Sequence, residues 1–184
     1  MSDTSTQLSA RPLKPQADPQ LVTPEGKLVL QRIDGVKIRS AITHPDERGE
    51  VCEIYNPAWG FHDEPMVYAY QICIRPGRVK GWVVHREQDD RLFASLGNIK
   101  AVLFDDRSES PTFGMVNELY LGERNRGMLI IPKGVFHALQ NVGNNDAILI
   151  NLPTRPYNHG KPDKFRIPLD TDKIPYEFQE RLGW

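Results

Sequence analysis

The chain has 184 residues, with 23 Lys and Arg against 24 Asp and Glu and a formal net charge of −1. This balance, without a long run of one sign, excludes the basic face that nucleic-acid-binding and membrane-surface proteins need. No apolar run approaches the roughly 18 residues of a membrane-spanning helix, and the N-terminal residues lack the apolar stretch of a signal peptide. Cys52 and Cys73 lie in apolar alternating segments and are expected to be reduced core residues. We therefore expect a cytoplasmic protein without nucleic-acid or membrane partners.

Residues 1–25 are polar and rich in proline, which predicts a flexible N-terminal arm before one domain over 26–184. From Lys27 onward, short β-branched and aromatic runs recur about every ten residues, with Gly, Pro, Asn and Asp between them. This spacing predicts a sandwich or closed barrel of about ten strands with little helix. The tail from Pro153 is rich in proline and charge; we expect it to wrap the barrel, with one short helical turn near its end. The expected strands are 27–33, 36–43, 50–56, 67–74, 81–85, 91–96, 99–104, 115–121, 128–132, 136–142 and 147–152.

Two motifs predict a ligand site inside the barrel. In a strand, residues i and i+2 point to the same face, so Val83 and His85 share a face, and a hairpin partner strand brings His137 opposite. Alternating residues from several strands would then line a cup, the usual place for a ligand in a barrel. The motifs run from Gly77 to Gly97 and from Pro132 to Asn141. They resemble the paired motifs of the cupin superfamily, a jelly roll (double-stranded β-helix), with Val83 at one usual histidine and Asp90 at the usual glutamate.

Further stretches resemble the dTDP-4-dehydrorhamnose 3,5-epimerase family. These are "HPDERGEVCEIYN", "KGWVVH", "DDRSESPTFG" and "IPKGVFHAL", and the resemblance covers about residues 35–175. It implies an isomerase acting on a nucleotide sugar of the dTDP-4-keto-6-deoxyhexose type, in deoxysugar, surface-polysaccharide or natural-product biosynthesis. It also implies a homodimer paired through N-terminal strands, no metal and no cofactor.

The resemblance also assigns site residues. The family's catalytic base aligns with Val83, its acid tyrosine lies near Asn151, and its orienting aspartate lies at about Asp170. His137 lies near the reacting sugar. The substrate-binding residues implied are Arg48, Glu53, Lys80, Arg91 and Asn151, with Arg48 and Lys80 on the phosphates.

Valine cannot accept a proton, so standard 3,5-epimerisation is expected to be weak or absent. His85 faces the same side as Val83 and is the expected base, with His137 and Asp170 completing the catalytic set. Two alternatives stay open. The chain can be a catalytically silent cupin that binds a sugar nucleotide, or a metal-dependent enzyme that uses His85, Asp90 and His137 as a two-histidine, one-carboxylate site.

Overall fold

The computed structural model describes residues 17, 20–26 and 29–178, and the chain divides into two compact units, Met1–Gln31 and Arg32–Trp184. In the first unit, the amide of Gly26 donates to the carbonyl of Thr23, and the amide of Val29 donates to the carbonyl of Leu21. Residues 29–33 form no strand, so the strand expected over 27–33 is absent from its described part.

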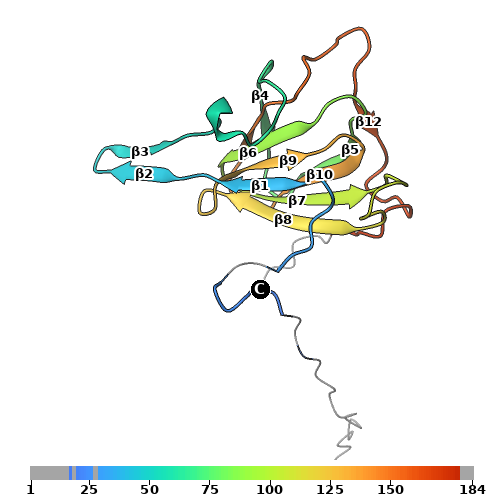
Figure 1. Ribbon diagram of the computed structural model, residues 1–184, viewed down its shortest axis with the longest axis horizontal. Coiled ribbons are helices and arrows are strands. Elements are labelled where there is room, and N and C mark those ends of the chain that lie inside the picture. The colour runs from blue at the N-terminus through green and yellow to red at the C-terminus, as the bar shows by residue number, and fades with distance from the viewer. Residues whose placement is uncertain (1–16, 18–19, 27–28, 179–184) are drawn as a thin grey trace, which may run out of the picture. The chain divides into compact units, whose positions relative to one another are not determined.

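The second unit is built on two five-stranded antiparallel sheets (Figure 1). The strand order is β1-β9-β6-β11-β4 in the first sheet and β12-β5-β10-β7-β8 in the second. In chain order, the strands of the first sheet are β1 (Lys37–Ser40), β4 (Tyr70–Ile74), β6 (Asp90–Leu96), β9 (Gly127–Ile131) and β11 (Ala147–Asn151). Those of the second are β5 (Val79–Val84), β7 (Asn98–Asp105), β8 (Val116–Gly122), β10 (Val135–Asn141) and β12 (Phe165–Arg166).

A separate hairpin of β2 (Thr43–Asp46) and β3 (Gly49–Cys52) extends beyond the two sheets (Figure 1). The short 3₁₀ helix η1 (Pro57–Trp59) follows it, and the Asn56 side chain caps this helix by accepting from the amide of Ala58. This is the only helix in the described part of the chain.

The main apolar core lies between the two sheets. Leu92 of β6 and Leu129 of β9 come from the first sheet, Ala101 of β7 and Leu139 of β10 come from the second, and all four are buried in one cluster. Because side chains alternate along a strand, the strand residues next to these core residues face away from the core. Trp82 of β5 faces away from this core and is buried with Ala138 and Ile174 in a second cluster, against which the partly buried Tyr176 and Phe178 of the C-terminal segment pack.

These sheets confirm the prediction of an all-β jelly roll. The tail forms no helix over its described residues, and 179–184 lie outside them. Cys52 and Cys73 are both free, but Cys73 is exposed, so the expectation that both are core residues is wrong. Cys73 lies on the edge strand β4, which in the described part of the chain pairs with β11 on one side only. No helix in the described part of the chain is long and apolar enough to cross a membrane.

Candidate active site

Two cavities adjoin inside and beside the barrel, and Tyr70, His85 and Lys164 line both. The inner cavity, of about 280 Å³, takes walls from both sheets. The outer cavity, of about 370 Å³, is lined mainly by the segment after β11. The inner lining comprises Tyr70, Gln71, Ile72, Cys73, Lys80, Val83, His85, Asp90, Leu92, His137, Leu139, Lys164 and Arg166. The outer lining includes Tyr68, Glu87, Arg155, Tyr157, His159, Lys161 and Asp163.

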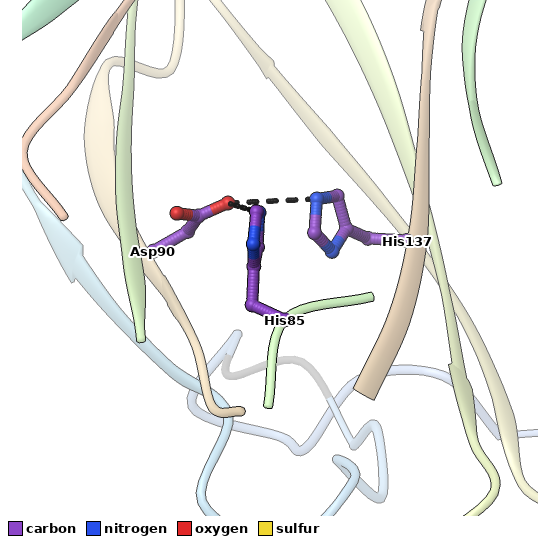
Figure 2. Close-up of side chains that lie close together, drawn as sticks. All are labelled: His85, Asp90 and His137. Atoms are coloured by element: carbon purple, nitrogen blue, oxygen red, sulfur yellow. Dashed lines mark ion pairs between the residues drawn. The ribbon is translucent and has the colours of Figure 1, made fainter. Parts of the chain in front are cut away.

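Three buried side chains converge in the inner cavity, and we call them the His–Asp centre: His85, Asp90 and His137 (Figure 2). The carboxylate oxygen Oδ2 of Asp90 lies 3.3 Å from Nε2 of His85 and 3.5 Å from Nε2 of His137. His85 follows β5, Asp90 begins β6 and His137 lies in β10 opposite Val83. The chain thus brings both sheets to one point, and Val83 and His85 line one cavity, as their spacing predicts.

The far side of each group in the centre is held by a separate partner. Nδ1 of His85 hydrogen-bonds the backbone carbonyl of Asp163, and Nδ1 of His137 lies 3.4 Å from the carbonyl of Val135. Oδ1 of Asp90 accepts from the side-chain amides of Gln88 at 3.0 Å and Asn151 at 2.9 Å. A carbonyl only accepts hydrogen bonds, so both histidines carry a proton on Nδ1 and direct Nε2 at the carboxylate.

The electrostatics of the centre set different protonation states. Burial alone would raise the pKa of Asp90, but hydrogen bonds and charge from the two histidines lower it to about 2. Burial opposes protonation of His85, but the Asp90 carboxylate outweighs it and raises the pKa of His85 above its ordinary value. Burial lowers the pKa of His137 to about 4. At neutral pH the centre therefore holds an ionised Asp90 and a neutral His137, and His85 is the group that takes up a proton.

The same convergence suits a divalent cation. A metal ion about 2.1 Å from each of three atoms separates them by roughly 3.0–3.4 Å, close to the two distances to Asp90. Ligating histidines usually donate their other nitrogen to a carbonyl, as both do here. His85, Asp90 and His137 are thus the residues that can hold a metal in the described part of the chain.

Tyr70 and Asn151 extend the centre across the first sheet. They pair directly between β4 and β11, and Nδ2 of Asn151 donates to the Tyr70 hydroxyl at 2.8 Å. Asn151 is fully buried and also donates to Asp90, so it reaches the centre through a hydrogen bond without lining either cavity. Burial and the Asp90 charge raise the pKa of Tyr70 to about 12.

Cations gather in the inner cavity on and beside β5, the strand that His85 follows. Lys80, Lys164 and Arg166 all line it, and we call them the cationic rim. Burial, followed by the charges of Arg166 and Lys80, lowers the pKa of Lys164. Positive charges that disfavour one another in this way are relieved by an anionic ligand. The rim therefore has the charge of a phosphate site.

Arg91 lies on the opposite face of β6 from Asp90, because successive side chains in a strand alternate. It lines neither cavity and is fully buried. Its guanidinium donates to four backbone carbonyls, those of Glu64, Pro65, Leu152 and Pro153. Arg91 thus joins two chain segments behind the wall of the site. The expectation that it contacts the substrate is wrong for this chain, because its side chain points to the face of β6 away from the cavity.

Three other expected site residues lie outside the two cavities of this chain. Arg48 is at the tip of the β2–β3 hairpin, with its side chain 81 % exposed and paired with Asp46. Glu53 is exposed and lines a small hollow with Arg39 and Trp59. Asp170 is exposed in the C-terminal segment, seven residues beyond the Asp163 that contacts His85. The sequence has no periodic pattern in this turn-rich tail, so it does not show which of the two aspartates reaches the site.

Several residues that line the cavities were not predicted from the sequence. Lys164 and Arg166 lie in the tail, where β12 pairs with β5 and places Arg166 opposite Val83. Tyr157 and His159, both exposed, line the outer cavity. No short-range pattern marks these positions, since the tail returns to the barrel over a long loop.

Comparison with known proteins places this chain in a family. The family described as dTDP-4-dehydrorhamnose 3,5-epimerase matches residues 31–179. The spore coat polysaccharide biosynthesis protein SpsL of Bacillus subtilis strain 168 is 35% identical over 150 residues, which is 79% of this chain and 96% of SpsL. The probable low-salt glycan biosynthesis epimerase Agl13 of Haloferax volcanii is 32% identical over 142 residues, which is 77% of this chain and 91% of Agl13.

A solved structure agrees with these relatives. The dTDP sugar isomerase from Desulfovibrio desulfuricans G20 superimposes with a TM-score of 0.74 at 27% identity, covering 79% of this chain and 91% of that one. The match over residues 31–179 includes every strand described above. The chain therefore belongs to the dTDP-4-dehydrorhamnose 3,5-epimerase family.

Proposed function

We propose that this protein is an epimerase or isomerase of nucleotide-linked 4-keto-6-deoxy sugars, which moves a proton on a carbon next to the ketone. The observation that carries the proposal is the His–Asp centre in a cavity with a cationic rim. SpsL and Agl13 are named for polysaccharide and glycan biosynthesis, and the Desulfovibrio protein for dTDP sugars. These names favour a dTDP sugar as substrate and glycan biosynthesis as the role, and the free cysteines favour the cytoplasm.

The cationic rim is proposed to bind the diphosphate. The cavity is lined by three positive side chains that repel one another, Lys80, Lys164 and Arg166. A diphosphate would neutralise this charge and accept hydrogen bonds from all three. The Asp90 carboxylate lies deeper, and the ionised Asp90 is already held by the two histidines. The anionic part of the ligand therefore sits at the rim and the neutral sugar reaches the centre.

His85 is proposed to be the base. Abstraction of a proton beside a ketone needs an acceptor close to the C–H bond, and Val83 supplies none. Asp90 makes His85 more basic, and the Asp163 carbonyl holds the proton on Nδ1, so Nε2, which faces Asp90 at 3.3 Å, is the nitrogen that takes the substrate proton. His137 lies 3.5 Å from the same carboxylate and lines the same cavity, and burial keeps its ring neutral.

We also propose a homodimer in which the β2–β3 hairpin of one subunit reaches the cavity of the other. Arg48 is exposed on a hairpin that leaves the barrel (Figure 1) and contacts neither cavity of its own chain. If Arg48 and Glu53 bind the nucleotide, the hairpin must therefore do so across a subunit interface. Pairing would also cover the exposed apolar side chains of the hairpin and its neighbours, such as Ile42 and Val51.

The test is solvent exchange. We expect the protein to incorporate deuterium from D₂O into dTDP-4-keto-6-deoxyglucose at C3 or C5, at one of the two carbons only, as read by NMR. Val83 in place of the family's base is the reason for the single site. Tight binding of the substrate without any exchange would instead show a silent sugar-nucleotide-binding protein.

A metal-dependent enzyme is the second candidate, favoured by the convergence of three ligand atoms within 4.8 Å. Elemental analysis of the purified protein separates the two. We expect less than a stoichiometric amount of metal and full exchange after chelation. One equivalent of a divalent metal, lost together with activity, would favour the second candidate.

A further inference from the structure

We propose that the Tyr70 hydroxyl is the group that returns the proton to the sugar, and that Asn151 positions it. This inference rests on the proposed function, because it names the second residue of the same proton transfer. Inversion of a carbon next to a ketone needs a base on one face and an acid on the other. His85 accounts only for the first.

The inner cavity offers few donors for this second role. The His–Asp centre supplies the base and its partners, and the cationic rim is proposed to bind the diphosphate. In the remaining inner lining, Tyr70 and Cys73 are the side chains that carry an acidic proton. Cys73 has no hydrogen bond to hold it toward the cavity among the described contacts, whereas Tyr70 is fixed by Asn151 at 2.8 Å.

The position of Tyr70 complements that of His85. Tyr70 begins β4, the edge strand of the first sheet, whereas His85 follows β5 of the second sheet. Both residues line both cavities, so a ligand that passes from one cavity to the other lies between them. Lys164, the other residue common to both cavities, follows directly on Asp163 and so enters from the side of His85. Tyr70 is thus the shared donor on the opposite wall.

Asn151 prepares the hydroxyl for donation. Its amide donates to the phenol oxygen, so that the phenol's own proton is left to point into the cavity. The same amide donates to Asp90, which links His85, Asp90, Asn151 and Tyr70 in one chain of polar contacts. Burial keeps the phenol protonated at neutral pH, the state that an acid needs.

The steps balance. Nε2 of His85 takes the α-proton, the C–H electron pair forms the C=C bond of the enolate, and the ketone oxygen takes the negative charge. The enolate then takes the proton of Tyr70 on its other face, which restores the ketone and leaves a tyrosinate and an imidazolium. Solvent returns a proton to the tyrosinate and removes one from the imidazolium.

Tyr70→Phe tests the assignment with dTDP-4-keto-6-deoxyglucose in D₂O. Without the acid, the proton taken by His85 returns to the face it left. We expect deuterium wash-in within about tenfold of the wild-type rate, while inversion of configuration falls by roughly 100-fold or more. Tyr120→Phe is the matched control, because this exposed tyrosine of β8 lines neither cavity, and it should keep both rates.

Each other outcome has a meaning. Inversion at the wild-type rate in Tyr70→Phe would overturn the inference and leave the proposed function intact. Equal loss of wash-in and inversion, with a raised KM, would make Tyr70 a binding residue and would also overturn it. An absence of wash-in by the wild-type protein would reject the proposed function itself.

Two further measurements keep the test usable if Tyr70→Phe does not fold. Replacement of Tyr70 by 3-fluorotyrosine preserves shape and gives a more acidic phenol, so the alkaline limb of the inversion rate should move to lower pH. An unmoved limb would contradict the inference. Asn151→Ala should lower kcat for inversion more than it lowers wash-in or raises KM, as expected of a positioning residue. A change in KM alone would contradict that role.

Discussion

Asp90 carries the chemistry of this site at the scale of single residues. One carboxylate oxygen faces two histidine nitrogens, and the other oxygen is held by two amides. A buried carboxylate satisfied on all sides remains ionised and makes its histidine partner more basic. His85, although displaced from the usual position of the base, thereby has the properties that the reaction requires.

His85→Ala should abolish deuterium exchange, with a loss of roughly 100-fold or more for a removed general base. Val83→His places a second imidazole on the same face and should create or raise exchange at a second carbon. NMR of the substrate in D₂O measures both. Exchange at both C3 and C5 that survives in His85→Ala would identify another base.

The exchange rate should fall as the pH drops through the raised pKa of His85, because only the neutral ring accepts a proton. Asp90→Asn removes the charge that raises this pKa, so the acid limb should move to lower pH even as the maximal rate falls. The groups facing His85 are Asp90, His137 and the Asp163 segment. A pH profile of kcat/KM checks the shift, and an acid limb unchanged in Asp90→Asn would exclude His85 as its origin.

At the scale of elements, strand β6 presents a site residue on one face and a structural residue on the other. Asp90 faces the cavity, whereas Arg91 faces away and ties the 64–65 and 152–153 segments together. The sequence predicts that successive side chains of this strand alternate between its two faces, but it does not show which of them face the cavity. Both Asp90 and Arg91 are polar, and nothing in "DDRLFASL" marks which of them faces inward.

Arg91→Met should destabilise the fold by about 2–4 kcal/mol, because it leaves buried carbonyls without donors. This corresponds to a fall in Tm of roughly 5–15 °C for a chain of this size. Arg155→Met is the control, because its ion pair with Glu64 is about half exposed and its loss should change stability little. Equal effects in thermal unfolding would show that the Arg91 contacts do not contribute more than a surface pair.

The barrel and the pair of His85 and His137 were predictable because strand period, turn residues and motif spacing are local patterns. The pairing of Tyr70 with Asn151 depends on register between strands far apart in sequence. Asp163 and Lys164 belong to a tail without periodicity. Their place depends on β12 pairing with β5, which no short stretch specifies.

At the scale of the whole molecule, the position of Arg48 makes assembly a functional matter. We expect a homodimer by light scattering at micromolar concentration, and Arg48→Ala should weaken dTDP binding by about one to two powers of ten. Calorimetry measures the second effect. A monomer with unchanged affinity in Arg48→Ala would remove the hairpin from the site.

Subunit mixing tests the crossing of the hairpin. Arg48→Ala and His85→Ala each impair every site, but a mixed dimer has one site with both residues intact if the hairpin crosses over. Random exchange should therefore restore about a quarter of the wild-type sites. Failure to recover activity, with exchange of subunits shown independently, would place Arg48 and His85 of one chain at the same site.

The four carbonyl contacts of Arg91 also bear on protein engineering. The segment after β11 lines most of the outer cavity, which makes it the first target for exchange. However, Pro153 in that segment is bound to the guanidinium that also holds Glu64 and Pro65. A loop exchange designed to accept a new sugar would therefore have to replace three segments together: residues 64–65, the start of β6 and residues 152–153.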